Sequence, residues 1–200
     1  FKAVLPHSVS NNIGIINFDT DDIKIGSKTY TTAEFCVYIA SIIAGTALNE
    51  SVTGKVISEI SSITESLTPD ADVDAGKLIL INDGEQVEIA RGVNSLTTVG
   101  TNQTEDMKSI KIVEGMDLIA EDIRTTFKEN YIGRSNSIEN KELFIAAVNQ
   151  YFETLTKEGV LYDGYEHYAE IDIDAQREYL ASKSVDVANM SDVAIKQANT

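Results

Sequence analysis

The chain has 200 residues, enough for one large domain or two small ones, and its 42% hydrophobic content is enough for a packed core. Its formal net charge is −16, from 32 acidic and 16 basic residues. A surface this acidic repels phosphate backbones and anionic lipid, so we expect neither a nucleic-acid partner nor a membrane partner.

The single cysteine, Cys36, excludes an internal disulfide and is predicted to be a small core residue. The longest apolar run, residues 35–44, is about half the length that a membrane-spanning helix needs. No signal peptide is recognisable, and the chain starts in a strand-like run without an initiator Met. We therefore expect it to be an internal fragment of a longer protein.

The first 66 residues predict a mixture of strands and one helix. Strands are expected at residues 1–6 and 13–18, and a small hairpin at 22–30 turns at Gly26-Ser27. Thr31 and Glu34 form a capping box for a helix from about Thr32 to Ala44, which Gly45 ends and whose apolar surface predicts burial nearly all round. The pattern of residues 53–64 fits either a helix or a strand.

A short helix and a hairpin follow. Thr68 and Pro69 are typical of a helix start, and Gly76 of its end. The sequence "LILINDGEQVEIAR" then predicts a strand at residues 78–82, a turn at Asp83-Gly84 and a strand at residues 86–91.

The remaining chain is mainly helical. An apolar face at helical spacing predicts a long helix ending near Gly133, formed by Ile112, Met116, Ile119, Ile123 and Phe127. Its first part, residues 108–113, also fits a strand. A second long helix is expected up to Gly159, a strand around Ile171 and Ile173, a helix through residues 175–183, and a last short helix capped by Ser191.

The sequence offers little evidence for metal or cofactor chemistry. Asp70, Asp72 and Asp74 have the spacing that opens a calcium-binding loop, but positions six and twelve hold Ala75 and Ile81 instead of Gly and Glu. A capped helix start explains these aspartates better. Phosphate-loop and dinucleotide-binding motifs are absent, so we expect no cofactor and no metal.

Catalytic motifs are also missing. His7 and His167 are the only histidines, and His167 is expected in a surface loop. Spacing alone leaves a Ser-His-Asp arrangement open, although the chain has no G-x-S-x-G motif. We therefore predict no catalytic residue.

Two further segments have a distinctive composition but contain no catalytic groups. Tyr162, Tyr165 and Tyr168 lie in an acidic stretch that is interpreted either as a packed loop or as a contact patch. At "ARGVNSLTT", after the hairpin, Gly92 is expected to allow a bend or a close backbone approach, and Asn94 and Ser95 to bond locally to exposed backbone.

Three segments of the chain resemble the contractile tail sheath proteins of Gram-positive phages and phage-tail-like particles. They are "LTPDADVDAGKLILINDGEQVEIARGVNSLTTV", "DIRTTFKENYIGRSNSIENKELFIAAVNQYFETLTKEGVL" and "AEIDIDAQREYLASK". The similarity runs in order from about Leu67, and "GVNSL" and "IDIDAQREYL" are its most specific parts. Sheath subunits of clostridial R-type bacteriocins and defective prophages look most similar.

The resemblance implies a mixed α/β fold in two parts. Residues 1–102 would be the end of a subtilisin-like α/β sheath domain, a name that refers to topology and not to protease activity. Residues 103–200 would be the sheath C-terminal domain, truncated before its last strands and its arm.

The resemblance also implies a mechanical function. Subunits would stack as hexameric rings in a helical sheath around a tail tube and contract to drive the tube through a bacterial envelope. The implied partners are other copies of the chain, the tube protein, and baseplate and tail terminator proteins. Assembly would occur in the host cytoplasm, as part of a virion tail or a tail-like particle released on lysis.

Two other classes of function stay open on the sequence alone. One is a hydrolase on a subtilisin-like fold, because fold does not determine function. The other is a generic protein-binding or scaffold module.

Overall fold

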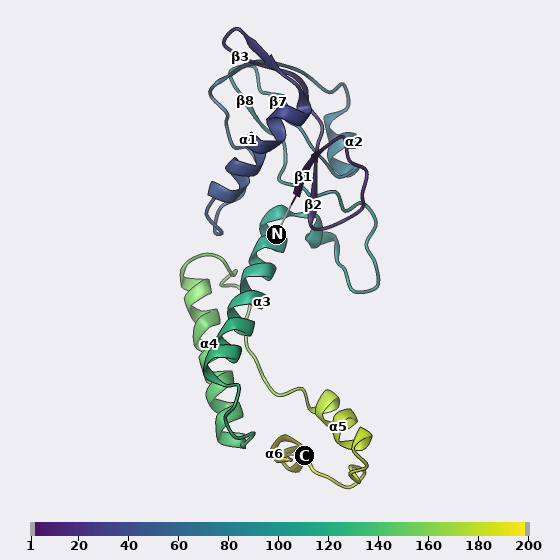
Figure 1. The fold of residues 1–200 in the computed structure, drawn as a ribbon, viewed down its shortest axis with the longest axis vertical. Coiled ribbons are helices and arrows are strands. Elements are labelled where there is room, and N and C mark those ends of the chain that lie inside the picture. The colour runs from purple at the N-terminus through teal and green to yellow at the C-terminus, as the bar shows by residue number, and fades with distance from the viewer. Residues whose placement is uncertain (1–2, 199–200) are drawn as a thin grey trace. The chain divides into compact units, whose positions relative to one another are not determined.

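The computed structural model describes residues 3–198 and has a mixed α/β fold (Figure 1). Its strands are β1 (Ala3–Pro6), β2 (Ile15–Phe18), β3 (Asp21–Ile25), β4 (Lys28–Tyr30), β5 (Ile60–Thr64), β6 (Lys77–Leu78), β7 (Leu80–Asn82) and β8 (Val87–Ile89). Its helices are α1 (Thr32–Gly45), α2 (Pro69–Asp74), α3 (Ile110–Asn130), α4 (Ile138–Lys157), α5 (Ile173–Ser182) and α6 (Asp192–Gln197), with a 3₁₀ turn at Glu105–Lys108.

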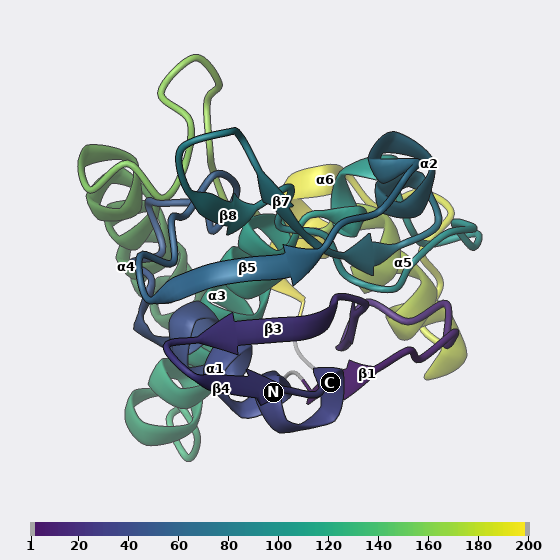
Figure 2. The same cartoon turned by 90° about the horizontal axis from the view of Figure 1, so that it is seen from above.

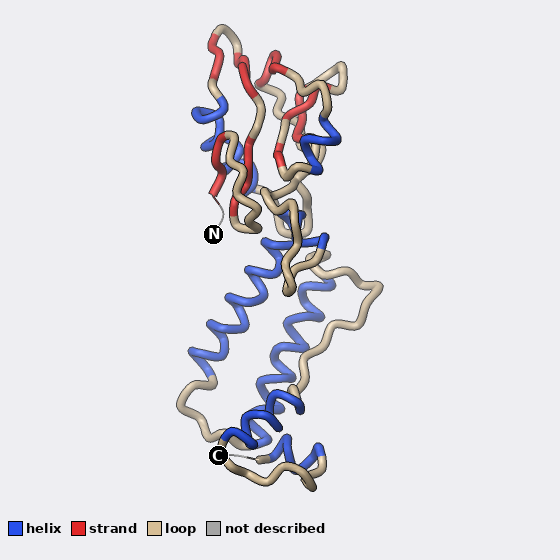
Figure 3. The backbone as a smooth tube through the Cα atoms, turned by 90° about the vertical axis from the view of Figure 1, so that its right-hand side faces the viewer, coloured by secondary structure: helices blue, strands red, loops and turns tan. Residues whose placement is uncertain are grey.

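The chain divides into two compact units, one up to Leu118 and the other from Ile119 onward, and the division falls inside α3. The described strands all belong to the first unit, and in Figure 3 they contrast with the helices and loops of the second. The predicted mixed α/β class is confirmed.

The first unit contains two three-stranded sheets and a hairpin. Strands β1, β2 and β6 are parallel, in the order β1-β2-β6. The antiparallel order β4-β3-β5 can be followed in Figure 2, and β7 pairs with β8. Fifteen buried residues form one core cluster here: Ile16, Phe18, Ile23, Phe35, Cys36, Ile39, Ile43, Val52, Ile57, Ile60, Leu78, Leu80, Val87, Ile89 and Ile110.

Helix α1 begins as predicted. Thr31 Oγ1 accepts from Glu34 N, and the Glu34 carboxylate accepts from Thr31 N, which completes the capping box. Two expectations were wrong. Val37 is 76% exposed, so α1 buries one face only, and Gly45 is the last helical residue while extended Thr46 is the cap. Because the helix covers the sheet with one face, its opposite apolar residues have no core to enter.

The hairpin differs from its prediction at both strands. The second strand, β8, is shorter than the predicted residues 86–91, and the first is divided. Leu78 pairs with β2, whereas Leu80 pairs with β8, so the expected continuous first strand is shared between two sheets. The connection from Asn82 to Val87 has four residues, with Gly84 at φ +101°. The sheet change at Ile79 depends on contacts far away in sequence, which explains why the local pattern did not indicate it.

The ambiguous stretch before α2 forms β5, which pairs with β3. The alternative strand at residues 108–113 is not formed, since α3 begins at Ile110. The predicted strand around Ile171 was also wrong. No strand is assigned there within the described residues, and Asp172 instead caps α5 by accepting from Ala175 N at 2.8 Å.

In the second unit, α4 packs along the later turns of α3. The rings of Phe127 and Phe144 meet edge to face at 5.2 Å between centroids, and Tyr131 also contacts Phe144, at 4.8 Å. Tyr151 on α4 donates to Asp122 Oδ2 on α3 at 2.5 Å. Burial, together with this hydrogen bond, raises the pKa of Tyr151 above its ordinary value.

Replacing Tyr151 with phenylalanine is expected to destabilise the second unit by about 1 kcal/mol, because a half-buried bond to a carboxylate is lost. Urea denaturation followed by circular dichroism measures the change. The exposed Tyr168 supplies the matched control, and Tyr168→Phe should leave the transition unchanged. Equal stability of both variants would show that the Tyr151–Asp122 bond contributes nothing.

None of the described helices combines the length and the apolar character that a bilayer-spanning segment needs.

Candidate functional site

Residues 92–96, here called the junction, follow β8 and hold several distant segments of the first unit together. Gly92 N donates to Thr53 Oγ1 at 2.9 Å, and the Gly92 carbonyl accepts from Ile110 N, the first residue of α3, at 2.9 Å. A Cβ at position 92 would lie 2.7 Å from Val52 Cγ2. The expected close approach at Gly92 is therefore confirmed, and its partner is the buried Val52.

Asn94 is fully buried and joins the junction to the segment that precedes α3. Its Nδ2 donates to the Met107 carbonyl at 2.7 Å, and its backbone N donates to the Lys108 carbonyl at 2.9 Å. Its Oδ1 accepts from Leu96 N at 3.0 Å. The local bond was predicted correctly, but the backbone that it satisfies is buried and not exposed, because Leu96 has 1% exposure and Asn94 has 0%.

Ser95 joins the junction to the loop before β2. Its backbone N donates to the Ile15 carbonyl at 2.8 Å, and its hydroxyl lies 3.0 Å from the Asn12 carbonyl and 2.6 Å from Ser10 Oγ. These bonds connect residues 80 or more positions apart, so the purely local bonding expected for Ser95 was wrong. Gly76, at φ +73°, passes this point, where an added Cβ would approach the Ser95 carbonyl carbon to 3.0 Å.

The sequence reasoning missed Asn11, which extends the junction. Its Oδ1 accepts from Thr97 N at 2.8 Å and from Thr98 N at 2.9 Å, and its φ is +45°. Paired asparagines at positions 11 and 12 are typical of a turn with positive φ, and this was the available signal. The junction thus fixes where α3 starts relative to the β-structure of the first unit.

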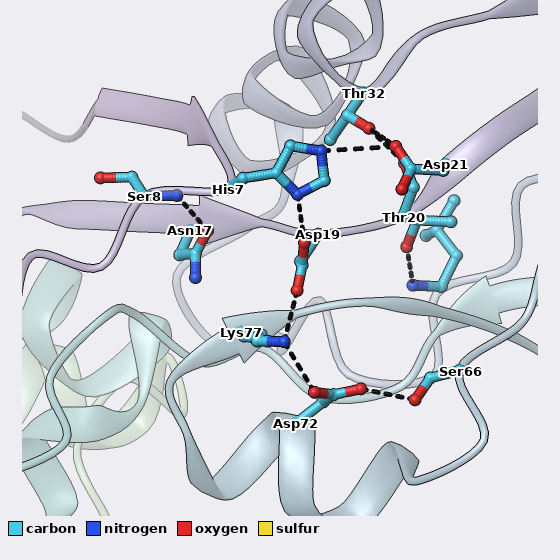
Figure 4. A network of polar contacts seen from close by, with 11 residues as sticks. His7, Ser8, Asn17, Asp19, Thr20, Asp21, Thr32, Ser66, Asp72 and Lys77 are labelled. Carbon is cyan, nitrogen blue, oxygen red and sulfur yellow. Dashed lines mark hydrogen bonds and ion pairs between the residues drawn. The ribbon is translucent and has the colours of Figure 1, made fainter.

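A second polar cluster lies at the carboxyl ends of β1 and β2 (Figure 4). His7 follows β1 and contacts Asp19, which follows β2, and its Nε2 lies 3.3 Å from Asp21 Oδ1. Lys77 Nζ bridges Asp19 at 2.7 Å and Asp72 at 2.8 Å. The cluster joins the edge of the parallel sheet to α2.

The cluster shifts the pKa values of its members. Burial alone would raise the pKa of Asp19, but hydrogen bonds from Lys77 and His7 outweigh it and lower the pKa. The Lys77 hydrogen bond and then that from Ser66 lower the pKa of Asp72, while bonds to Asp19 and Asp72 raise the pKa of Lys77. All three shifts favour the charged, paired state.

We expect this cluster to stabilise the first unit between pH 3.8 and pH 10.5, the ordinary pKa values of Asp and Lys. Lowered carboxyl pKa values give stability that is lost as the pH falls through them, and the raised Lys77 pKa gives stability that is lost as the pH rises through it. Lys77→Met should lower the free energy of unfolding by about 1–2 kcal/mol at pH 7. It should also make that free energy fall less steeply as the pH is lowered, which flattens the acid limb of the curve.

Denaturation curves from pH 2 to pH 8 measure that effect. Lys108→Met is the matched control, since Lys108 pairs with Glu105, whose side chain is 71% exposed. If the acid limb keeps its slope in Lys77→Met, the cluster does not set the pH dependence.

The other sequence candidates lie apart from the junction. Asp70, Asp72 and Asp74 are in α2, and the described residues contain no group of three or more His, Cys, Asp or Glu arranged for a metal. Thr68 precedes α2 but makes no capping bond with its side chain. Tyr162, Tyr165 and Tyr168 are 68%, 73% and 61% exposed, which contradicts the packed-loop interpretation and leaves the contact-patch interpretation open.

The histidines have no described hydroxyl partner. His7 contacts the carboxylates of Asp19 and Asp21, and His167 Nε2 donates to the Tyr162 carbonyl at 2.8 Å in a loop. A serine nucleophile needs a histidine within hydrogen-bond reach as its base. Within the described residues, neither histidine has the serine partner that such an arrangement requires.

Residues 102–196 match the family model of the phage tail sheath C-terminal domain. The chain is 37% identical over 202 aligned residues to the tail sheath protein of Clostridium phage phiCD119, covering 100% of this chain and 56% of that protein.

Solved structures give the same fold. The sheath tail protein of Desulfitobacterium hafniense matches with a TM-score of 0.71 at 18% identity, covering 78% of this chain and 38% of that one. The Listeria innocua sheath tail protein matches with a TM-score of 0.67 at 18% identity, over 79% and 39%. The helical sheath of the anti-feeding prophage in its contracted state matches with a TM-score of 0.58 at 10% identity, over 79% and 46%.

The chain spans about half the length, or less, of these relatives. The predicted resemblance is confirmed by the family match and by the clostridial phage relative. The chain therefore belongs to the phage tail sheath protein family, and its residues 102–196 belong to the sheath C-terminal domain.

Proposed function

We propose that this chain is part of a structural subunit of a contractile sheath, which polymerises as hexameric rings around a tail tube. The observation that carries the proposal is the 37% identity along the whole chain to a phage tail sheath protein. Contraction would drive the tube through a bacterial envelope. The solved contracted helical sheath with the same fold supports this class of motion.

The architecture of the first unit suits a load-bearing subunit. The buried Asn94 bonds to the segment before α3, and the buried Ser95 bonds to β2. These bonds hold the start of α3 in a fixed position relative to the β-structure. A subunit that stores and transmits strain needs such rigid connections, because only a stiff body passes force from one interface to another. The proposed domain boundary lies at 102/103, with a subtilisin-like α/β part before it, and the family match from residue 102 supports that position.

The proposed partners are further copies of the chain, the tube protein, the baseplate and the tail terminator. Assembly would take place in the host cytoplasm, in a phage or in an R-type bacteriocin. Electron microscopy of the full-length protein, expressed with its tube protein, tests the proposal. Hollow sheaths or six-fold rings are expected, and monodisperse globular particles would contradict it.

The alternative of a hydrolase is tested separately. We infer that the chain is not an enzyme, since its family is structural and its histidines contact carboxylates and a carbonyl. A serine-reactive probe should leave the full-length protein unlabelled. Labelling that disappears in His7→Ala or His167→Ala would overturn this inference.

Ionic strength is expected to change sheath assembly, because this part of the subunit carries a net charge of −16, neighbouring copies of it repel one another, and salt screens that repulsion. The measurement is sheath length and yield from about 20 to 500 mM NaCl by electron microscopy. Sucrose at matched osmolality is the control. Sheath length that is independent of salt would show that electrostatics contributes little to the contacts.

A further inference from the structure

The second unit contains an apolar cleft of about 630 Å³ beside the contact of α3 with α4. Its apolar lining comes mainly from Phe127, Tyr131, Ile132, Phe144, Ile145 and Val148, and the segment before α5 adds Ala169 and Ile171. Phe127 is 45% exposed and Ile132 is 64% exposed. Large apolar side chains that stay this accessible, gathered around one hollow, are typical of a docking surface.

The cleft is bordered by two cations. Arg134 stacks its guanidinium on the Tyr131 ring at 5.2 Å, and Lys141 Nζ donates to the Lys196 carbonyl at 3.2 Å. Neither forms an ion pair with a carboxylate among the described residues, and Glu170 also lines the cleft. The partner that fits this lining presents aromatic or apolar side chains together with negative charge.

The chain itself carries a segment of that chemistry. Tyr162, Tyr165 and Tyr168 are exposed in the loop between α4 and α5. Residues 158–174 contain no Lys or Arg, and their acidic residues are Glu158, Asp163, Glu166, Glu170, Asp172 and Asp174. Tyrosine supplies a large contact area at low entropic cost, which makes it frequent at interfaces.

Contacts within the loop order Tyr162 and Tyr165 before any partner binds. The rings of Tyr162 and Tyr165 meet edge to face at 5.7 Å, and His167 donates to the Tyr162 carbonyl at 2.8 Å. A Cβ at Gly164 would overlap the ring of Tyr162, so a larger residue there would displace this ring. A loop ordered in advance loses less entropy on docking.

The start of the tyrosine loop lies away from the cleft of the same chain. Phe144 lines the cleft, whereas the loop leaves α4 after Lys157, and thirteen helical residues span about 20 Å. The loop then returns along α4, so that residues 169–171, directly after it, line the cleft. We propose that the Tyr162–Tyr168 loop of one copy docks into the Phe127–Phe144 cleft of a second copy. The contact joins two different surfaces and is therefore head-to-tail, the kind that generates rings or open helices.

This proposal rests on the proposed sheath function, and charge reversal in the full-length protein tests it. Arg134→Glu and Asp163→Arg should each raise the concentration needed for sheath assembly at least tenfold, and the double variant should recover most of the loss. Arg134 and Asp163 are both exposed, so the thermal unfolding curve of each variant should match that of the parent protein. Glu153→Arg, on the exposed surface of α4, is the control and should assemble normally.

Cross-linking gives an independent readout. A protein with Ile132→Cys and Tyr162→Cys should form ladders of disulfide-linked copies on oxidation, while the parent, whose Cys36 is buried, should not. Normal assembly of both charge variants without a ladder would overturn the docking contact and leave the sheath function intact. A ladder without sheaths would support the contact and contradict the sheath function. A cross-link to a different protein, or within one chain, would overturn the proposed occupant.

Discussion

Alanine at position 92 is expected to lower the free energy of unfolding of the first unit by about 1–3 kcal/mol, and valine by more. The reason is steric, because the new Cβ would lie 2.7 Å from Val52 Cγ2, and Val52 is only 4% exposed and cannot swing into solvent. Urea denaturation of Gly92→Ala and Gly92→Val measures the effect. In the full-length protein, Gly92→Val should impair folding or assembly.

The clash with Val52 can be tested by a double-mutant cycle. Val52→Ala alone leaves a cavity and should destabilise, but in combination with Gly92→Ala it removes the obstructing methyl group, so the double variant should be more stable than the sum predicts. Gly115→Ala is the matched control, since no atom lies within 4 Å of its added Cβ in α3, and alanine there should stabilise by up to about 1 kcal/mol. If the effects of Val52→Ala and Gly92→Ala are additive, Val52 does not limit which side chain fits at position 92.

Replacing Asn94 with alanine is expected to have a comparable effect, about 2–4 kcal/mol. The substitution leaves the Met107 carbonyl and Leu96 N without their side-chain partners in a buried site, and each lost partner costs about 1–2 kcal/mol. Asn94→Asp separates shape from donor capacity, because it keeps the acceptor for Leu96 N but cannot donate to Met107. It should also destabilise, by placing a charge where exposure is 0%.

Hydrogen exchange locates the effect of Asn94. The amides of Leu96 and Ile110 should exchange faster in Asn94→Ala than in the parent, since the junction holds the start of α3. The control is Asn102→Ala, in an exposed turn. Unchanged protection at Ile110 would mean that Asn94 fills space without fixing the helix start.

The features predicted correctly from the sequence are those decided by neighbouring residues. Thr31 and Glu34 form their capping box because a cap needs only the first turn of a helix. Ser191 caps α6, and Gly76, Gly133 and Gly159 adopt positive φ at helix ends, for the same local reason. Most helix boundaries were therefore predicted closely.

The wrong predictions concern residues whose structure is determined by contacts with segments distant in the sequence. Ile171 and Ile173 alternate as a strand does, but Asp172 caps a helix there instead. The run from Leu78 to Asn82 looks like one strand, and its division at Ile79 depends on pairing with β2 and β8. Likewise, the sequence indicated that Gly92 and Asn94 matter, but their partners Val52 and Met107 are brought to them only by the fold.

The functional conclusion came from resemblance rather than from chemical motifs. The "GVNSL" segment contains no catalytic group, and the structure explains why it is distinctive: a missing Cβ at Gly92 and buried polar bonds at Asn94 and Ser95. The carboxylates of Asp70 and Asp74, which first suggested a metal, are surface groups of α2.

Helical reconstruction by cryo-electron microscopy, before and after contraction of the intact particle, tests the central claim most directly. The account predicts that this chain is found in the sheath, with the junction of residues 92–96 unchanged in both states and the contacts between subunits rearranged. A sheath built from another protein, or a particle in which this chain occupies a single fixed position without contracting, would contradict it.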